Sequence, residues 1–372
     1  MSTFTELGIN KSYIKALKEL HIIQPTEIQE TVIPILLESK TDLIGLAQTG
    51  TGKTAAFGLP VLHAIEKNND DVQALIIAPT RELVQQIQKQ LFRFTKYLDY
   101  KIFAEGVYGG EKIDRQIKAL TRKTHIVVAT PGRLLDLVER GSVDISNVKI
   151  VVLDEADEML SMGFKEDLNK ILKFNTAKRN TWLFSATMPE EIRHMVKTYM
   201  SSDAIKIEVN KNALVNENIS HHYIHTNIKD KLNMIIRILD KRQSERGIIF
   251  CRTKAGTKTL TQQLQNEGFP VGALEGDMQQ KERDKVMRAF KNESVQVLVS
   301  TDVSARGIDV RDLSFVLHHQ LPEHLEYYTH RSGRTARAGK TGQSIALLIP
   351  GEMQKVLDIQ KELGITFREI AM

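Results

Sequence analysis

Short runs rich in valine, isoleucine and leucine alternate with amphipathic stretches along nearly the whole sequence. A continuous apolar run is typical of a strand covered on both faces, and an amphipathic stretch is typical of a helix packed on one face. Strands are expected at 42–46, 75–78, 126–129, 149–153, 181–184, 247–251, 295–300, 313–318 and 344–349. Helices are expected between them, among others at 55–65, 83–94, 164–174, 229–241, 258–266, 281–290 and 352–363. The alternation predicts an α/β protein of parallel sheets flanked by helices.

The length of 372 residues exceeds what one hydrophobic core usually supports, so two domains are expected. The polar stretch from Asn210 to Asn218 shows the hydrophobic periodicity of neither a strand nor a helix. It predicts a linker over 210–217, between domains at 1–209 and 218–372. The chain has 51 Lys and Arg residues and 46 Asp and Glu residues, a formal net charge of +5. Residues 1–209 carry 27 basic and 27 acidic side chains, so the whole excess of positive charge lies in the second domain. This excess permits a polyanionic partner but is also typical of a solvated surface.

The single cysteine, Cys251, excludes an intramolecular disulfide and favours a reducing compartment. The first residues contain no basic segment followed by an apolar one, and no apolar run approaches the ~18 residues needed to span a bilayer. A soluble, cytoplasmic protein without a membrane partner is therefore expected.

The strongest local signal is a loop that reads Ala-Gln-Thr-Gly-Thr-Gly-Lys-Thr, between a predicted strand and a predicted helix. A glycine-rich turn entering a helix directs backbone N–H groups and the positive end of the helix dipole toward a phosphate chain. Lys53 can then reach the β- and γ-phosphates, and the Thr54 hydroxyl can bind Mg²⁺. A merely flexible loop is the alternative, but the strand–loop–helix context favours nucleotide binding. The candidate residues are Ala47, Gln48, Thr49, Gly50, Thr51, Gly52, Lys53 and Thr54.

An acidic run, Asp154-Glu155-Ala156-Asp157, follows the predicted strand 149–153. A carboxylate at the tip of a neighbouring parallel strand is suited to hold a phosphate-bound Mg²⁺, and Asp154 fits this role. Glu155 can orient and deprotonate an attacking water. An acidic helix start, favoured by the helix dipole, is the alternative, but the Lys53 loop favours the catalytic interpretation. ATP and Mg²⁺ are therefore the expected ligands.

These two segments, with further motifs in the same order, resemble the DEAD-box ATP-dependent RNA helicases over almost the whole chain. The resemblance implies two tandem RecA-like domains, of which the first binds ATP. Pro25-Thr26-Glu27-Ile28-Gln29 is similar to the family's Q motif, at about residues 2–30; Gln29 would read the adenine, with Phe4 at the place of the distal aromatic. Ser185-Ala186-Thr187 is similar to the motif that couples hydrolysis to strand separation, for which Ser185, Thr187 and Asp157 are the candidates.

The second half contains the family's later motifs but no glycine-rich lysine loop, so it is not expected to bind a nucleotide of its own. His330-Arg331-Ser332-Gly333-Arg334-Thr335-Ala336-Arg337 is similar to the sixth motif, which implies catalytic roles for His330, Arg334 and Arg337. The spacing of the last two arginines would place them on one helical face. An arginine at the γ-phosphate can be worth ~10³–10⁵ in rate, whereas surface salt bridges are the alternative role. The fifth motif adds Gly307 and Asp309 as ATP-binding candidates.

RNA contacts are implied by the resemblance of several short segments in both halves. Small residues in them indicate backbone amides near phosphates, which carry no base information, so sequence-independent binding is expected. The arginines are dispersed and only 6% of residues are aromatic, which argues against a base-stacking platform. Selection of RNA over DNA would come from 2′-hydroxyl contacts and strand shape. The candidates are Pro79, Thr80, Arg81, Gly109, Gly110, Thr130, Gly132, Arg133, Arg252, Gln280, Arg283 and Thr301.

The expected activity is RNA-stimulated ATP hydrolysis coupled to local unwinding of short RNA duplexes or to remodelling of RNA–protein complexes. An ATP-gated RNA clamp and a phosphoryl-transfer kinase are the alternatives, although a kinase leaves Arg334 and Arg337 unexplained. Partners in ribosome assembly or RNA decay stay open.

His225 and the histidine pairs at 221–222 and 318–319 are predicted to be exposed strand residues rather than metal ligands, since adjacent strand residues point to opposite faces. Trp182 lies on a predicted strand and is expected in the core.

Overall fold

The computed structural model describes residues 2–48, 50–209, 218–305, 313–336 and 340–371. The chain divides into two compact units, Met1–Asn210 and Lys211–Met372. The segment expected to be a linker, 210–217, lies outside the described residues.

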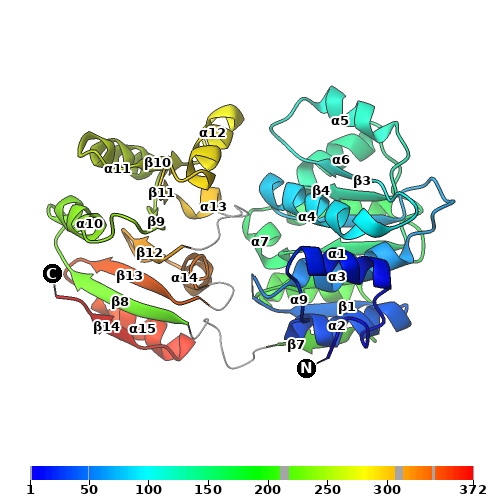
Figure 1. Cartoon of the computed structure of the whole chain (residues 1–372), viewed down its shortest axis with the longest axis horizontal. Helices are drawn as coiled ribbons and strands as arrows, with labels where there is room; N and C mark the ends of the chain where they lie inside the picture. Colours follow the sequence, from blue (N-terminus) through cyan, green and yellow to red (C-terminus); the bar gives the residue numbers. More distant parts are fainter. Residues whose placement is uncertain (1, 49, 210–217, 306–312, 337–339, 372) are drawn as a thin grey trace. The chain divides into compact units, whose positions relative to one another are not determined.

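Seven parallel strands form the sheet of the first unit, and their order across the sheet is β3-β4-β2-β5-β6-β1-β7 (Figure 1). The strands are β1 (Leu43–Leu46), β2 (Ala74–Ile77), β3 (Ala104–Val107), β4 (Ile126–Ala129), β5 (Ile150–Leu153), β6 (Asn180–Ser185) and β7 (Ile205–Glu208). The helices are α1 (Lys11–Glu19), α2 (Glu27–Glu38), α3 (Lys53–Ala64), α4 (Arg81–Phe94), α5 (Ile113–Leu120), α6 (Pro131–Glu139), α7 (Ala156–Ser161), α8 (Lys165–Phe174) and α9 (Glu190–Tyr199), with a 3₁₀ turn at Thr95–Tyr97.

Both faces of this sheet are covered by helices, because successive strand residues point to opposite sides. Ala74 and Ile76 of β2 pack in one core with α1–α4, whereas Leu75 and Ile77 pack in the other with α5–α9. Trp182 of β6 is buried in the first of these cores, which confirms its predicted place. The double burial explains why the central strands read as continuous apolar runs.

The sheet of the second unit has the order β10-β11-β9-β12-β13-β8-β14, which is the first order with seven added to each strand number. All its strand pairs are parallel as well. The strands are β8 (Ile219–His225), β9 (Gly247–Phe250), β10 (Val271–Leu274), β11 (Val297–Ser300), β12 (Phe315–His318), β13 (Gly342–Leu348) and β14 (Phe367–Glu369). The helices are α10 (Lys231–Asp240), α11 (Lys254–Asn266), α12 (Gln280–Lys291), α13 (Asp302–Ala305), α14 (Leu325–Ser332) and α15 (Met353–Leu363).

Helices cover both faces of the second sheet too. α10 and α11 pack with Ile249 and Leu317 on one face, and α12–α15 pack on the other, for example with Phe250 and Ala346. Two units of one topology, each a parallel sheet between helical layers, confirm the predicted α/β class.

Every strand named from the sequence lies within two residues of an observed strand. The strands missed from the sequence are β3, β7, β10 and β14, and all four lie at sheet edges. Edge strands are covered less completely, and β7 alternates half-buried with exposed residues. Such strands therefore lack the continuous apolar run that marks a central strand. Within the described part of the chain, no helix is long and apolar enough to cross a membrane.

Candidate functional site

Apart from Phe4 and Gln29, which precede β1, the candidate residues of the first unit lie in loops or at helix starts that follow the carboxyl ends of its strands. Those assigned to ATP and to coupling follow β1, β5 and β6, and those assigned to RNA follow β2, β3 and β4. The sheet order brings β5, β6 and β1 side by side and places β3, β4 and β2 together beyond them. Figure 1 shows β3 and β4 apart from β1 in this sheet. One edge of the sheet thus holds two separate groups of candidate residues.

The glycine-rich loop joins β1 to α3, as the sequence predicts. α3 begins at Lys53, and its N-cap is Gly52 in the left-handed region, with φ 92°. Gly50 is also left-handed, with φ 86°. A Cβ atom on Gly52 would lie 2.3 Å from the Gln29 amide nitrogen, so the backbone conformation and the close approach both require glycine there.

Side chains around the loop bind its carbonyl groups. The Lys53 ammonium is buried and donates to the Ala47 carbonyl at 2.9 Å. The Thr51 hydroxyl donates to the Gln48 carbonyl at 2.8 Å, and the Thr26 hydroxyl donates to the Thr51 carbonyl at 2.7 Å. These three loop carbonyl groups are hydrogen-bonded within the protein, and the N–H groups at the start of α3 are suited to bind an anion. The loop therefore fits a phosphate chain. Thr54 is half-buried on the first turn of α3, and Thr49 lies outside the described residues.

Gln29 links α2 to this loop. Its amide nitrogen donates to the Gly52 carbonyl at 2.9 Å, and its amide oxygen accepts from the Thr26 N–H at 3.1 Å. The side chain is 2% exposed. Phe4, the other candidate of the amino-terminal segment, lies in the hydrophobic core of the unit. Adenine recognition by either residue stays a prediction.

A buried carboxylate follows β5. Asp154 is 3% exposed, and burial raises its pKa to about 7, although the nearby Lys53 ammonium opposes the shift. Among described residues, the hydrogen bond to this carboxylate comes from the Glu155 N–H, at 3.0 Å. A cation would relieve the cost of this burial. Mg²⁺ is commonly held by one or two protein groups plus phosphates, so Asp154 with Thr54 fits such an ion.

Glu155 lies between β5 and α7 with φ 52°, a left-handed conformation that non-glycine residues seldom adopt. Backbone strain of this kind clusters at functional sites, where the surrounding structure holds it. Its side chain is half-buried, and that of Asp154 is buried. Adjacent carboxylates thus have different environments, which suits one to a metal and the other to a water molecule.

Asp157 connects the acidic run to the segment after β6. Its carboxylate accepts from the Thr187 N–H at 2.9 Å and from the Thr187 hydroxyl at 2.8 Å. The Asp157 N–H donates to the Ser185 hydroxyl at 3.3 Å. The three residues predicted to couple hydrolysis to strand separation are therefore in direct contact.

Two of the candidate RNA residues of the first unit, Arg81 and Arg133, are linked to Tyr108, which directly follows β3. The Arg81 guanidinium lies over the Tyr108 ring, 5.0 Å from its centroid. Arg133 donates to the Gln116 amide oxygen at 2.9 Å and to the Glu111 carbonyl at 3.1 Å, and Gln116 donates to the Tyr108 carbonyl at 3.0 Å. Tyr108 and Gln116 were missed from the sequence; the position of Tyr108 directly before two glycines was the available signal.

The small candidate residues of this half differ in exposure. Gly109, Gly110 and Gly132 are exposed, whereas Pro79, Thr80 and Thr130 are buried. Thr80 is the N-cap of α4, where its hydroxyl accepts from the Leu83 N–H at 3.3 Å. The exposed glycines thus offer backbone N–H groups, and the buried residues shape the helix starts beside them.

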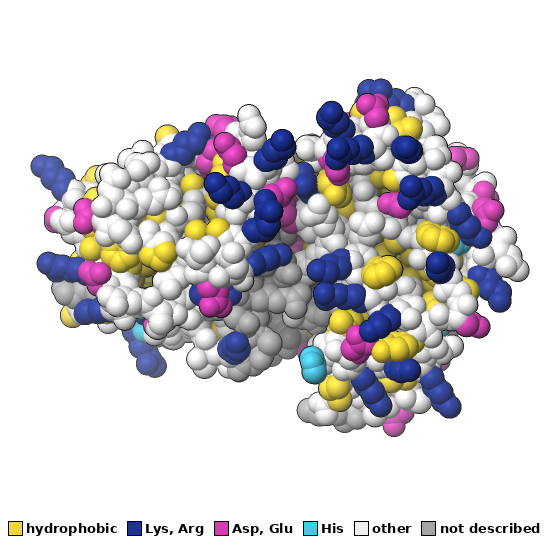
Figure 2. Space-filling view, turned by 45° about the horizontal axis from the view of Figure 1, so that its top comes forward, with side chains coloured by type: hydrophobic (Ala, Val, Ile, Leu, Met, Phe, Trp, Pro, Cys, Tyr) yellow, Lys and Arg dark blue, Asp and Glu magenta, His cyan; other side chains and the backbone are white. Residues whose placement is uncertain are grey.

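In the second unit, the candidate RNA residues follow β9, β10 and β11, again three neighbouring strands. Arg252 forms an ion pair with Glu323 at 3.3 Å, and Gln280 on α12 donates to Asp284 at 2.7 Å. Arg283 donates to the Ser304 carbonyl at 2.6 Å. Thr301 is buried, and its hydroxyl donates to Ser304 at 3.0 Å. Figure 2 shows Lys and Arg side chains dispersed over the visible face of each unit, with Asp and Glu between them.

The segment with His330 and the arginines differs from its prediction in one respect. α14 ends at Ser332, so Arg334 lies in the turn after the helix, and the helical-face argument for Arg334 and Arg337 fails. Arg334 is buried and His330 half-buried. Arg337, Gly307 and Asp309 lie outside the described residues.

Arg331 was not singled out from the sequence, yet it is central in this part of the structure. It is 3% exposed and donates two hydrogen bonds to the Asp302 carboxylate, at 2.5 and 2.7 Å. A bidentate pair of this kind fixes the relative position of α13 and α14. Sequence spacing gives no signal that these two residues would meet.

The prediction of exposed histidines is wrong for both pairs, since His222 and His319 are half-buried. His221 and His318 are buried, and both bond to polar side chains inside the second unit. Tyr328 comes between the two rings, because β8 and β12 lie on either side of β13 in the sheet. His225 is exposed as predicted. Across the described residues, no group of three or more His, Cys, Asp or Glu side chains is arranged to hold a metal.

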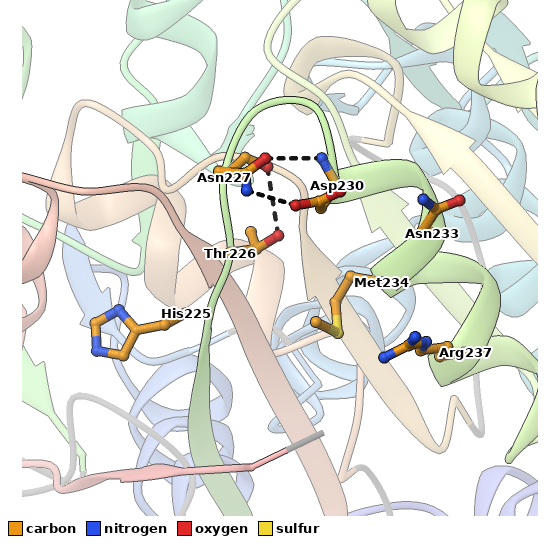
Figure 3. A pocket seen from close by; sticks show the side chains of 7 residues that line it. All are labelled: His225, Thr226, Asn227, Asp230, Asn233, Met234 and Arg237. Carbon is orange, nitrogen blue, oxygen red and sulfur yellow. Dashed lines mark hydrogen bonds between the residues drawn. The ribbon is translucent and has the colours of Figure 1, made fainter.

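Lys231 stands in the second unit where Lys53 stands in the first, as the first residue of the helix after the sheet's first strand. Its buried ammonium donates to the carbonyls of His319 and Leu347. The turn before it contains no glycine, and Asn227 and Asp230 bond to each other across it (Figure 3). A pocket of about 610 Å³ lies there, lined by His225, Thr226, Asn227, Asp230, Asn233, Met234 and Arg237. This position offers no glycine-rich cradle for phosphates.

Comparisons with known proteins agree with this geometry. Residues 26–195 match the family model described as DEAD/DEAH box helicase, and residues 230–339 match the helicase conserved C-terminal domain. The DEAD-box ATP-dependent RNA helicase CshA of Geobacillus kaustophilus is 40% identical over 361 residues, which are 97% of this chain and 76% of the relative. The ATP-dependent RNA helicase CshA of Listeria monocytogenes is 43% identical over 353 residues, 95% of this chain and 67% of the relative.

Solved structures resemble the chain over nearly its whole length. The structure of S. cerevisiae Dbp5 bound to RNA and ADP BeF3 has a TM-score of 0.91 at 31% identity and covers 100% of this chain and 96% of its own. A DEAD box protein from Methanococcus jannaschii is 39% identical, with a TM-score of 0.57 and 99% of each chain covered. Taken with the matching family models, these similarities show that the chain belongs to the DEAD-box helicase family.

Proposed function

We propose that this chain is an ATP-dependent RNA helicase, which hydrolyses ATP to ADP and phosphate when RNA is bound. Hydrolysis would drive local, sequence-independent separation of short RNA duplexes or the remodelling of RNA–protein complexes. The observation that carries the proposal is the buried Asp154 carboxylate with its raised pKa, next to Glu155 and close to Lys53 of the glycine-rich loop. The related structures of Dbp5 with RNA and ADP BeF3, and of Mss116p with ssRNA and AMP-PNP, support the same ligands here.

ATP would bind along the loop from Ala47 to Thr54. On binding, the Lys53 ammonium exchanges the Ala47 carbonyl for phosphate oxygens, which are stronger acceptors because they are charged. Gln29 keeps one amide hydrogen and one oxygen lone pair beyond its bonds to the loop and to Thr26, and these fit the edge of an adenine. Mg²⁺, when held by Asp154 and Thr54, would neutralise charge on the phosphates.

Glu155 would orient the attacking water and take its proton. The side chain is half-buried and lies beside Asp154, so it can reach a water molecule at a nucleotide held by the loop. Arg334 would stabilise the charge that develops on the γ-phosphate. Arg337 and His330, with Gly307 and Asp309, keep the roles that the family resemblance implies.

The contact of Asp157 with Ser185 and Thr187 would couple ATP binding and hydrolysis to the position of the RNA-binding residues. A change at Asp154 or Glu155 passes along a short stretch of backbone to Asp157 and through two hydrogen bonds to Thr187. Direct contacts of this kind can transmit a small displacement because packed elements do not deform continuously.

RNA would bind through its backbone. Exposed glycines 109, 110 and 132 offer N–H groups, and Arg81 and Arg133 are held by Tyr108 and Gln116. Arg252, Gln280, Arg283 and Thr301 would make the matching contacts from the second unit. No dense basic block is needed, since a few positioned groups suffice for phosphate contacts.

The test compares ATP hydrolysis with and without single-stranded RNA, together with strand separation of a short labelled duplex. Glu155→Gln should retain ATP and RNA binding and lose turnover by at least about 10²-fold. Glu190→Gln, at the exposed start of α9, is the matched control and should behave as wild type. RNA-stimulated hydrolysis without strand separation would favour a clamp, and phosphate transfer without RNA stimulation would favour a kinase.

A further inference from the structure

A buried polar network occupies the interior of the second unit, beneath α14. Its members come from three strands and one helix: His221 on β8, His318 on β12, Ser344 on β13, and Tyr328 and Ser332 on α14. Each is buried, with exposed fractions between 0% and 5%. Buried polar groups are costly unless they are hydrogen-bonded, so such a network specifies one arrangement of the elements that carry it.

The Ser344 hydroxyl is the centre of this network. It lies 2.9 Å from His318 Nε2, 2.9 Å from the Ser332 hydroxyl and 3.2 Å from the Tyr328 hydroxyl. A hydroxyl can donate once and accept twice, so three partners use its whole capacity. Ser344 therefore joins both network residues of α14 to the strand that carries His318.

Arg331 fixes the direction of the hydrogen bonds that reach this centre. A guanidinium only donates, so His318 Nδ1, 3.3 Å from Arg331 Nη1, must accept. His318 therefore carries its proton on Nε2 and donates it to Ser344. Arg331 also binds the Asp302 carboxylate and the Gln320 carbonyl, so the chain of bonds runs from α13 through α14 to the strands. Burial and Arg331 lower the pKa of His318 well below its usual value, which keeps the ring neutral.

Two backbone hydrogen bonds connect the network to Arg334. The Arg334 N–H donates to the Arg331 carbonyl at 3.1 Å, and the Thr335 N–H donates to the Ser332 carbonyl at 3.1 Å. The turn that carries Arg334 is thus built on Ser332, which belongs to the network, and on Arg331, which bonds to it. A rotation or shift of α14 would break the bonds to Ser344 and move Arg334 with the helix.

We propose that Ser344 is a positioning residue, whose buried hydroxyl holds α14 in the one orientation that places Arg334 for ATP hydrolysis. The inference rests on the proposed function, because it assigns Arg334 to the hydrolytic step. Ser344 touches neither nucleotide nor RNA in this scheme and acts through Ser332, Tyr328 and His318. Its removal should lower the rate of the chemical step and leave ligand binding nearly unchanged.

The test is Ser344→Ala in the full chain, with Thr261→Val as the matched control. Thr261 on α11 is also buried, and its hydroxyl donates to the Thr257 carbonyl at 2.8 Å within the same helix. We expect Ser344→Ala to lower kcat for RNA-stimulated ATP hydrolysis by about tenfold or more, since small displacements of catalytic groups are costly. The KM for ATP and the affinity for RNA should stay within about twofold of wild type, and Thr261→Val should leave kcat within about twofold.

A double-mutant cycle separates positioning from a general loss of stability. Tyr328→Phe removes one partner of the Ser344 hydroxyl and also the hydrogen bond to His221 Nδ1, so the loss of kcat in the double variant should be smaller than the sum of the two single losses. Equal losses of kcat in Ser344→Ala and Thr261→Val, or a Ser344→Ala enzyme with wild-type kcat, would overturn the inference.

Hydrogen–deuterium exchange gives a readout that does not depend on activity. In Ser344→Ala the amides of peptides covering 325–336 should exchange faster, because those of Arg334 and Thr335 depend on the position of α14. Peptides of the first unit should be unchanged. Unaltered exchange at 325–336 refutes the positioning role. A wild-type chain without RNA-stimulated hydrolysis refutes the proposed function instead, whatever the exchange result.

Discussion

Replacing Gly52 with alanine should destabilise the first unit and weaken ATP binding through one identified contact. Gly52 is the N-cap of α3 with φ 92°, and a Cβ atom there would lie 2.3 Å from the Gln29 amide nitrogen. Gln29 donates to the Gly52 carbonyl, so its amide cannot move aside without losing that bond. The substitution therefore combines a strained backbone with the loss of a buried hydrogen bond.

The two contributions can be estimated separately. A left-handed backbone costs a residue with a Cβ about 1–2 kcal/mol. Loss of the Gln29 hydrogen bond adds about 0.5–1.5 kcal/mol. Gly163, between α7 and α8, has φ 86°, and a Cβ atom added there would meet nothing within 4 Å among the described residues, so Gly163→Ala isolates the backbone cost. The difference between the two variants measures the contact with Gln29.

The single tryptophan provides the assay. Trp182 on β6 is 1% exposed, and its indole N–H donates to the Thr41 carbonyl at 3.2 Å, so its fluorescence reports unfolding of the first unit. In urea titrations followed by this signal, the free energy of unfolding of Gly52→Ala should be lower than that of Gly163→Ala by about 0.5–1.5 kcal/mol. Binding of an ATP analogue should weaken in Gly52→Ala alone, because Gly163 lies outside the loop.

A double variant tests whether the contact with Gln29 causes the extra destabilisation of Gly52→Ala. In a Gln29→Ala background the clash with Gln29 is absent and the Thr26 hydroxyl, 3.1 Å from the added Cβ atom, is the tight contact that remains, so the extra cost of Gly52→Ala over Gly163→Ala should fall. Equal costs of the two glycine substitutions in the wild-type background would show that Gln29 yields without penalty. A Gly52→Ala chain that binds the analogue normally would remove the loop from the nucleotide site.

Further substitutions test other parts of the site. Lys53→Ala should abolish binding of an ATP analogue in a fluorescence titration, because the loop loses its ammonium; unchanged affinity would contradict the assigned site. Thr187→Val removes one of two hydrogen bonds to Asp157 and should lower strand separation more than ATP hydrolysis, and parallel losses would disprove coupling. Burial lowers the pKa of His221 to about 4, so its contribution to stability is complete above about pH 6.5 and lost as pH falls through about 4. Amide exchange of β8 should therefore quicken over this range in wild type and change less in His221→Phe.

Most candidate residues of the first unit could be assigned to strand ends from the sequence, because they directly follow apolar runs. The loop after β1 and the acidic run after β5 are separated by about a hundred residues, yet both were expected at the carboxyl edge of one parallel sheet. A helix directly after the loop was predicted at 55–65 and is observed from Lys53, and the burial of Trp182 was predicted as well. These features depend on local order along the chain, which a sequence displays directly.

Other features depend on contacts that local order does not contain. The strand order divides the edge into a half with β5, β6 and β1 and a half with β3, β4 and β2, and no local pattern encodes that order. His221 and His318 read as polar strand residues, and only the packing of Tyr328 between them explains their burial. The end of α14 at Ser332 also escaped prediction, because the spacing of Arg334 and Arg337 is compatible with a continued helix.

The two units share one topology, but the residues that follow their equivalent strands carry opposite charges. In the first, β5 leads to Asp154 and Glu155 at the start of α7, and Lys53 reaches a loop carbonyl that a phosphate can replace. In the second, the equivalent strand β12 leads to α14, which carries Arg331, and to Arg334 in the turn after it. Lys231 is held by carbonyls that follow β12 and lie in β13, and burial lowers its pKa, so this lysine contributes to packing rather than to phosphate binding. An acidic strand end suits a metal ion, and a basic one suits the charge that develops during hydrolysis. In the proposed function, the same order of strands would therefore support two different tasks, and a few residues at the strand ends would decide which task each unit performs.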